Sequence, residues 1–145
     1  MQLTDFAERL TELIYERNID LKTFSQSLDV SASCISQYIH RESLPTVDNL
    51  IKIANFFNCS TDYLLGREEE NLQLKFNLCP PFSEQLKFLK DYFNCTAYSI
   101  YVGAGISKSR YFDWQKGKRQ PSLDNIIKLA EHFDRRVDFI LGRET

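Results

Sequence analysis

The stretch 45–68 reads PTVDNLIKIANFFNCSTDYLLGRE, and the stretch 121–144 reads PSLDNIIKLAEHFDRRVDFILGRE. The two align at an offset of 76 residues without a gap, and 12 of the 24 aligned positions are identical. The same offset also pairs three apolar positions near the start of each copy, namely Phe6, Leu10 and Leu13 with Phe82, Leu86 and Leu89. A repeat that keeps one register over so much of the chain indicates two copies of one small domain.

The composition fits two small soluble domains. The chain has 145 residues, of which 43% are hydrophobic, with 11 Phe and 7 Tyr to build two cores. It contains no apolar run of 18 residues or more, so the sequence predicts no membrane span. The first residues, MQLTDFAERL, do not follow the signal-peptide pattern. We therefore expect a cytoplasmic protein that does not contact a membrane.

Charge is divided unequally between the two copies. The net charge of the chain is −2, which by itself does not favour a nucleic-acid binder. Residues 1–70 carry 6 basic and 12 acidic side chains, a net charge of −6, whereas residues 71–145 carry 12 and 8, a net charge of +4. The second half therefore holds most of the positive field. The alternative interpretation is ordinary variation between two solvated surfaces.

Hydrophobic spacing predicts an all-α protein with five helices in each copy. In the first copy the helices are expected over about 5–17, 20–29, 31–40, from 46 onward, and 60–66. Asp5, with Glu8 three residues later, is a start signal, and Ser31 is a good N-cap. The second copy repeats these boundaries near Ser83, Thr96, Ser107, Ser122 and Gly142. Its second helix is expected to be short or irregular, because Tyr98, Tyr101, Val102 and Gly103 are poor helix formers.

The predicted domains span residues 1–67 and 82–145, with a linker at 68–81. Within this linker, residues 72–78 alternate apolar and polar side chains, which is the period of a β-strand. A lone strand leaves its backbone groups unpaired. One hypothesis is that it pairs with the same strand of a second subunit to form a homodimer. The other is an extended linker whose apolar side lies on a neighbouring helix.

Residue types do not favour a metal site, a cofactor or an enzyme. The four cysteines (Cys34, Cys59, Cys79 and Cys95) form no C-x-x-C pair, and only two histidines are present. Free thiols in a reducing cytoplasm are the more natural interpretation. No glycine-rich phosphate loop follows a strand, and no acid–base pair has motif spacing. We expect no catalytic residue, no cofactor and no separate domain for a small-molecule ligand.

In each copy the second and third predicted helices, joined by a tight turn, form a helix-turn-helix. Ile35, Tyr38 and Ile39 fall on the core side of the third helix of the first copy. The opposite face is small and polar, and consists of Ala32, Ser33, Ser36, Gln37 and His40. In the second copy this face is more basic, with Lys108, Ser109, Phe112, Asp113 and Lys116, Arg110 beside them, and Lys118 and Arg119 in the next loop. Such a helix fits the major groove of duplex DNA.

Several of these side chains could contact bases or phosphates. Gln37 could bind adenine, and Lys108 or Arg110 could read guanine or hold a phosphate. Asp113 could accept a hydrogen bond from cytosine or repel a phosphate. Lys22 lies near the start of the preceding helix, which in this motif crosses the phosphate backbone. Because the two faces differ, we expect the copies to read different half-sites.

These motifs carry a resemblance to a known family. Residues 30–38 (VSASCISQY), 45–54 (PTVDNLIKIA) and 62–66 (DYLLG) resemble the lambda-repressor/Cro-type (XRE) helix-turn-helix family. Residues 106–118 (ISKSRYFDWQKGK), and the chain from there to Leu141-Gly142, resemble it too, so the resemblance covers about nine-tenths of the sequence. It implies tandem five-helix DNA-binding domains in a bacterial or phage transcription regulator, which in this family is usually dimeric.

The resemblance also assigns positions to the two kinds of DNA contact. The family's base-reading residues fall on Ala32, Ser33 and Gln37, and on Lys108, Ser109 and Asp113. Its phosphate-contacting positions fall on the start of the second helix and on Ser31, with Ser107 as its equivalent in the second copy, and on His40 and Arg41. The predicted function is sequence-specific binding of double-stranded DNA, most simply by a repressor.

An alternative function stays open. One or both copies could have kept the fold and lost DNA binding, and could now serve as a protein-interaction or dimerisation module. The acidic first half favours this hypothesis, as do Leu21 and Ala97, which stand where the family often has Gln, and the outward Phe112.

Overall fold

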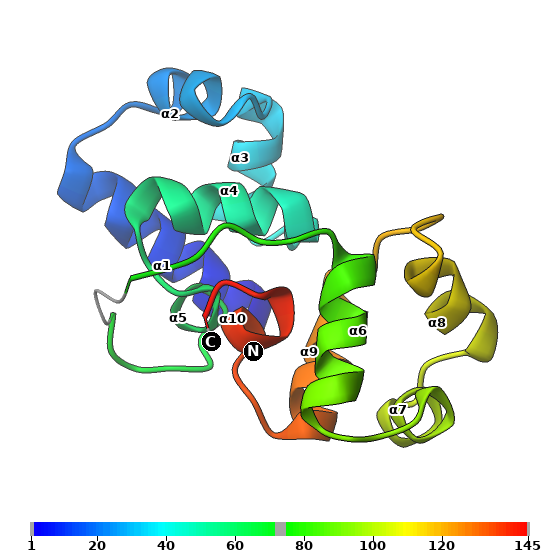
Figure 1. The fold of residues 1–145 in the computed structure, drawn as a ribbon. Coiled ribbons are helices and arrows are strands. Elements are labelled where there is room, and N and C mark those ends of the chain that lie inside the picture. Colours follow the sequence, from blue (N-terminus) through cyan, green and yellow to red (C-terminus); the bar gives the residue numbers. More distant parts are fainter. Residues whose placement is uncertain (1, 72–74, 145) are drawn as a thin grey trace. The chain divides into compact units, whose positions relative to one another are not determined.

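A computed structural model describes residues 2–71 and 75–144 of the chain (Figure 1). The described residues form ten α-helices and contain no β-strand, so the predicted all-α fold class is confirmed. The chain divides into two compact units, which we call unit 1 (residues 1–74) and unit 2 (residues 75–145). Each unit holds five helices.

Unit 1 places its helices around a core of aliphatic and aromatic side chains. Its elements are α1 (Gln2–Arg17), α2 (Leu21–Leu28), α3 (Ala32–Ile39), α4 (Val47–Phe57) and α5 (Thr61–Leu64). Helix α1 packs against α3 and α5, and α2 packs against α3 and α4. Phe6, Phe24 and Ile35 are fully buried at the centre of these contacts.

Unit 2 repeats the arrangement. Its elements are α6 (Phe82–Tyr92), α7 (Ala97–Ala104), α8 (Lys108–Gln115), α9 (Leu123–Phe133) and α10 (Val137–Leu141). Helix α6 packs against α8 and α10, and α7 packs against α8 and α9. Trp114, which stands at the position of Tyr38, is buried, and its ring meets that of Phe82 edge-on at 5.9 Å.

Local sequence signals explain most helix ends. Ser31, Thr46 and Ser60 each accept a hydrogen bond from a backbone N–H in the first turn of the helix that follows. Helix α2 ends at Asp29 in the left-handed conformation (φ 55°), and α7 ends at Gly105 in the same conformation (φ 72°). The predicted boundaries at these residues are confirmed.

The start of α1 differs from the prediction, whereas α6 begins near Ser83 as predicted. Helix α1 begins at Gln2, so Asp5 lies within the helix and does not cap it. The backbone of Gly66 (φ 77°) approaches α1 so closely that a Cβ on Gly66 would lie 2.3 Å from Asp5 Oδ2. Helix α6 begins at Phe82, one residue before Ser83, after Pro81. The prediction of an Asp5–Glu8 start signal is therefore wrong.

The prediction of a short or irregular second helix in unit 2 is also wrong. Helix α7 has 8 residues, as many as α2. A capping box between Thr96 and Ser99 stabilises its first turn, and the Tyr101 ring lies 5.7 Å from that of Tyr111 on α8. Gly103 allows α7 to approach α9 closely, because a Cβ there would lie 2.3 Å from the ring of His132. Tertiary packing thus outweighs weak intrinsic propensity.

The segment 75–81, which we call the arm, belongs to unit 2. Of the predicted strand 72–78, residues 72–74 lie outside the described residues, and residues 75–78 form no regular secondary structure. Instead, Asn77 N–H donates to the carbonyl of Arg143 at 2.7 Å, and the Arg143 guanidinium lies 4.2 Å from the centre of the Phe76 ring. The arm is therefore held by residues near the far end of its own unit.

Candidate nucleic-acid interface

The turn between the second and third helices has the same geometry in both units. In unit 1, Val30 N–H donates to Ser25 O at 3.1 Å, after the left-handed residue Asp29. In unit 2, Ile106 N–H donates to Tyr101 O at 2.8 Å, after Gly105. These bonds satisfy carbonyls at the end of one helix and direct the chain into the next. Each unit thus forms the predicted helix-turn-helix.

Buried apolar residues, most of them aromatic, fix the inner side of α3 and α8. In unit 1, Ile35 and Tyr38 are buried, and Asn49 Nδ2 donates to the Tyr38 hydroxyl at 3.0 Å. In unit 2, Tyr111 and Trp114 are buried. Desolvation raises the pKa of Tyr38 and of Tyr111 above the ordinary tyrosine value, so both stay neutral at physiological pH. The opposite faces of α3 and α8 are thereby turned to solvent.

The residues predicted to read bases lie on these outer faces. Ala32, Ser33 and Gln37 are exposed on α3, and Ser36 is half-buried. On α8, Lys108 and Ser109 are exposed, and Asp113 is half-buried. The structure therefore brings each set together on the outer side of its own helix. Ala32, Ser33, Lys108 and Ser109 lie in the first turn, the end that helix-turn-helix proteins present to base edges, and Gln37 and Asp113 follow about one turn later.

The residues of unit 1 predicted to contact phosphates are partly engaged elsewhere. Ser31 accepts from Cys34 N–H at 3.1 Å, and His40 Nδ1 lies 2.8 Å from Ser36 O. Arg41 is left-handed (φ 62°), and its guanidinium pairs with Glu8 on α1 at 3.5 Å. Lys22 is exposed near the start of α2. The Arg41–Glu8 pair weakens the positive potential that a phosphate would meet here.

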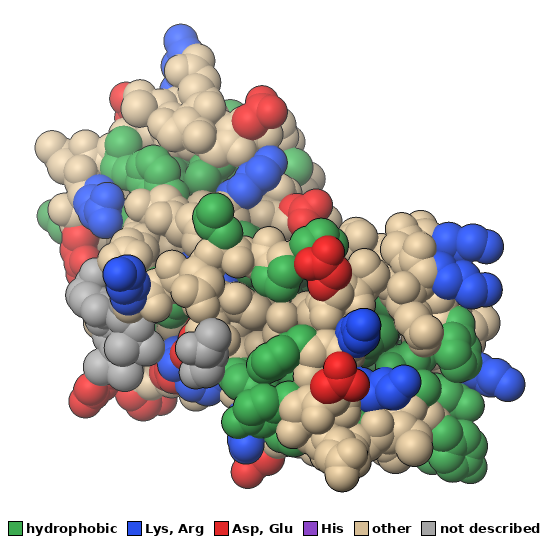
Figure 2. All heavy atoms as spheres, in the orientation of Figure 1, with side chains coloured by type: hydrophobic (Ala, Val, Ile, Leu, Met, Phe, Trp, Pro, Cys, Tyr) green, Lys and Arg blue, Asp and Glu red, His purple; other side chains and the backbone are tan. Residues whose placement is uncertain are grey.

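Unit 2 presents a stronger basic surface. Ser107 accepts from Arg110 N–H at 3.2 Å, as Ser31 does in unit 1. The basic side chains on α8 and in the following loop are all exposed, namely Lys108, Arg110, Lys116, Lys118 and Arg119. Figure 2 shows Lys and Arg side chains gathered on the surface over α8. This cluster matches the electrostatic footprint of a phosphate-binding surface.

The ion pair between Asp113 and Arg119 is a feature that spacing alone does not predict. Arg119 Nε lies 3.6 Å from Asp113 Oδ2, across the loop that follows α8. The carboxylate at the position of Gln37 is thus partly neutralised by a basic neighbour. The pair shows how Asp113 can be accommodated on a surface that otherwise attracts phosphates.

Equivalent segments of the two units differ in charge. Residues 20–43 carry two basic and three acidic side chains, a net charge of −1, whereas residues 96–119 carry five and one, a net charge of +4. Unit 2 also exposes two side chains on α7 that the sequence identified only as poor helix formers, since Tyr98 is 67% exposed and Val102 is 55% exposed. Lys22 and Gln26 occupy these positions in unit 1.

Other kinds of site find little support in the described residues. No group of three or more His, Cys, Asp and Glu side chains among them could hold a metal ion. The four cysteines form no disulfides, with Cys59 buried and the other three half-buried. Among the described residues, no helix is both long and apolar enough to cross a membrane.

Comparisons with known proteins match both units. The helix-turn-helix family matches residues 12–64 and 102–140. The HTH-type transcriptional regulator ImmR of Bacillus subtilis (strain 168) is 31% identical over 85 residues, covering 58% of this chain and 67% of ImmR. AnsR of the same strain, also an HTH-type transcriptional regulator, is 48% identical over 40 residues, covering 28% of this chain and 34% of AnsR.

A third relative comes from another genus. The uncharacterized HTH-type transcriptional regulator RP766 of Rickettsia prowazekii (strain Madrid E) is 31% identical over 72 residues, covering 47% of this chain and 78% of RP766. No solved structure matches the chain. The family match covers more than half of the sequence and falls on both helix-turn-helix units, as the sequence motifs predicted. The chain therefore belongs to the XRE-type helix-turn-helix family.

Proposed function

We propose that this protein is a transcriptional regulator in the cytoplasm that binds double-stranded DNA sequence-specifically and represses by occluding a promoter. The observation that carries the proposal is the exposed basic cluster on α8 and its loop, at the place where a helix-turn-helix meets DNA. The relatives are named as transcriptional regulators, which supports the same function.

The proposal divides the work between the units. Unit 2 supplies most of the affinity, because the five exposed basic side chains of α8 and the following loop neutralise phosphates and release counterions. Lys108, Ser109 and Asp113 read bases from α8, and Ser107, Arg110 and Lys116 hold the backbone. In unit 1, Ala32, Ser33, Ser36 and Gln37 would read a second, different half-site, with Lys22, Ser31, His40 and Arg41 at phosphates.

The test is a selection of bound duplexes from a random DNA pool at two salt concentrations. The expected result is an enriched motif whose affinity falls steeply with salt. Changing Lys118 and Arg119 to Ala should weaken binding to every sequence and flatten the slope of log K against log salt by about 0.9 per lost phosphate contact. Lys128→Ala is the matched control, because Lys128 pairs with Asp124 on α9 at 3.4 Å, outside the helix-turn-helix. A folded protein that enriches no motif would sink the proposal.

Association of two chains through residues 72–78 remains a prediction. A homodimer would present four helix-turn-helix motifs to DNA. Residues 75–78 form no strand in the single chain, so pairing would have to order them against the second copy. Sedimentation at micromolar concentration tests this point, and a monomer under those conditions counts against pairing.

A second candidate function applies to unit 1 alone. Its helix-turn-helix segment has a net charge of −1, and its α2 begins with Leu21, which is 39% exposed and cannot hydrogen-bond a phosphate. These observations favour a unit that has kept the fold but docks a protein instead of DNA. Full retention of DNA affinity and sequence preference after changes to the outer face of α3 would support this function.

A further inference from the structure

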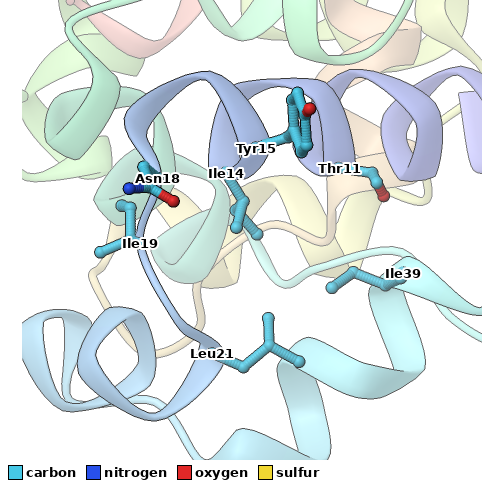
Figure 3. A pocket seen from close by; sticks show the side chains of 7 residues that line it. All are labelled: Thr11, Ile14, Tyr15, Asn18, Ile19, Leu21 and Ile39. Atoms are coloured by element: carbon cyan, nitrogen blue, oxygen red, sulfur yellow. The ribbon is translucent and has the colours of Figure 1, made fainter.

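Unit 1 has an apolar pocket where α1, α2 and α3 meet. Its volume is about 290 Å³, and most of its lining is aliphatic or aromatic. Figure 3 shows the side chains of Ile14, Leu21 and Ile39 converging on it from three different helices. Ile19 lies at one end of the pocket, and Tyr15 on its wall is 85% exposed. Single exposed apolar side chains are ordinary on a protein surface, but here five apolar side chains surround one hollow.

Unit 2 provides an internal control for the meaning of this pocket. At the offset of 76 residues, the five apolar lining positions Ile14, Tyr15, Ile19, Leu21 and Ile39 are replaced by Lys90, Asp91, Cys95, Ala97 and Gln115. Unit 2 nevertheless forms the equivalent helices α6, α7 and α8. The fold therefore does not require the bulky aliphatic and aromatic side chains that unit 1 carries at these positions, and their presence there needs another explanation.

The charges beside the pocket are mainly acidic. Glu8, Glu12 and Glu16 are spaced four residues apart and form an exposed row along α1. Glu12 and Glu16 directly follow the lining residues Thr11 and Tyr15 in the sequence. Asp20 lies between the lining residues Ile19 and Leu21 in the chain, and hydrogen bonding by Thr23 N–H lowers the pKa of its carboxyl, which keeps it ionised. Three basic residues lie nearby: Arg41 is paired with Glu8, the Arg17 guanidinium donates to the Phe57 carbonyl at 3.4 Å, and Lys22 is exposed next to Leu21. Unit 1 nevertheless carries an excess of six negative charges over residues 1–70. Such a surface repels phosphates and attracts a basic partner.

The size of the pocket limits what can enter it. A volume of about 290 Å³ lies at the lower limit of pockets that enclose a drug-sized molecule, about 300 Å³. One or two bulky side chains from a protein suit this space better, with the surrounding surface contacting the rest of the segment. Protein interfaces commonly place one such anchor in a pocket and surround it with polar contacts.

We propose that this pocket is the docking site for a basic protein segment that inserts a bulky aliphatic or aromatic side chain between Tyr15 and Leu21. Lysine or arginine side chains of the segment lie against Glu12, Glu16 and Asp20. The proposal names the partner for the second candidate function of unit 1, on which it rests, and does not depend on DNA binding by unit 2.

The test selects displayed random peptides on the whole chain and compares three proteins. These are the wild type, a variant with Tyr15→Asp, Leu21→Ala and Ile39→Gln, and a Gln26→Val control. The variant takes the residues that unit 2 already carries at these positions, so its fold should survive. Gln26→Val likewise introduces the unit 2 residue, at an exposed site on α2 that does not line the pocket.

The expected result is enrichment of peptides rich in Lys and Arg with one bulky apolar side chain. Their affinity, measured by fluorescence anisotropy, should fall about tenfold or more in the triple variant and stay unchanged in the control. On the wild type, the methyl resonances of Ile14, Leu21 and Ile39 should shift when the peptide is added, a readout that needs no variant.

Three outcomes would overturn the proposal. The first is the absence of enriched peptides, and the second is the enrichment of peptides that bind the triple variant equally well. The third is self-association that the triple variant abolishes, which would show a second copy of the chain in the pocket. DNA affinity is measured in parallel. If no peptide is enriched and the triple variant loses DNA affinity, the surface belongs to DNA. Failure of the wild type to bind any DNA would reject only the regulator function.

Discussion

Alanine substitutions at two glycines, Gly105 and Gly66, should distinguish the cost of a left-handed backbone from the cost of a steric clash. A Cβ at Gly105 (φ 72°) would meet no atom within 4 Å, whereas a Cβ at Gly66 (φ 77°) would lie 2.5 Å from Asp5 Cβ. Gly105→Ala should therefore cost only the left-handed conformation, about 1–2 kcal/mol. Gly66→Ala should cost more, since it adds the contact with α1. Urea unfolding of both variants measures the difference, and equal costs would contradict it.

The buried ion pair of unit 2 has a more exposed counterpart in unit 1. Asp138 and Arg143 side chains are both 0% exposed, with Oδ1 and Nη1 2.6 Å apart, whereas Arg67 remains 26% exposed and lies 3.5 Å from Asp62. Asp138→Ala leaves a buried guanidinium without this carboxylate and should destabilise unit 2 by about 3–5 kcal/mol. Asp62→Ala should cost unit 1 less, because water can solvate Arg67. Thermal unfolding followed unit by unit checks the order.

At the scale of single helices, the cap of α2 gives a pH dependence that α7 lacks. The Thr23 backbone N–H donates to Asp20 Oδ1 at 2.7 Å and lowers the pKa of that carboxyl. Because the folded-state pKa is depressed, the cap stabilises α2 above the ordinary aspartate pKa, and this contribution disappears as the pH falls through the folded value. The α7 cap, Thr96, does not titrate.

Hydrogen exchange measured at falling pH should therefore show α2 amides losing protection before those of α7. Asp20→Thr installs the unit 2 cap and should remove this acid sensitivity while keeping the helix. If the wild type and Asp20→Thr lose protection of α2 in parallel, the cap is not the cause.

Helices with strong periodicity and good caps could be predicted from the sequence, whereas other elements depend on distant contacts. The caps Ser31, Thr46 and Ser107 are local signals and are confirmed. The regularity of α7 depends on Gly103 facing His132 of α9, which no local pattern contains. The start of α1 could not be predicted, because Asp5 and Glu8 have the spacing of a capping box. In the structure Asp5 lies inside the helix, beside Gly66, a contact that the local sequence does not show.

From the sequence, the candidate DNA interface could be predicted only as a set of residues on the solvent-exposed faces of two helices. Helical periodicity is enough to place Gln37 and Lys108 on exposed faces. The Arg41–Glu8 and Asp113–Arg119 pairs join different elements of a unit, so spacing within one helix could not show them. The pocket could not be predicted either, because its lining comes from three helices and the turn between α1 and α2, and each apolar residue alone is typical of a core.

At the scale of the whole molecule, the two units should respond differently to loss of a base-reading side chain. Lys108→Ala should reduce affinity and relax the preference at one base pair by about 1–3 kcal/mol. Gln37→Ala should relax a different position by a similar amount if unit 1 reads bases. Duplexes selected from a random pool by the two variants show whether both units or only unit 2 recognise bases. An unchanged motif for Gln37→Ala would remove unit 1 from base recognition.

The arm determines how unit 2 would respond to a pulling force. Residues 76–77 and Arg143 lie in contact, so the chain enters and leaves this unit at nearly the same point. A pull on these two ends would act on the Asn77–Arg143 hydrogen bond and the Phe76 ring before it reached the helices. Under tension, unit 2 should therefore lose the contacts between the arm and Arg143 first, one after another, and its helical core should unfold last.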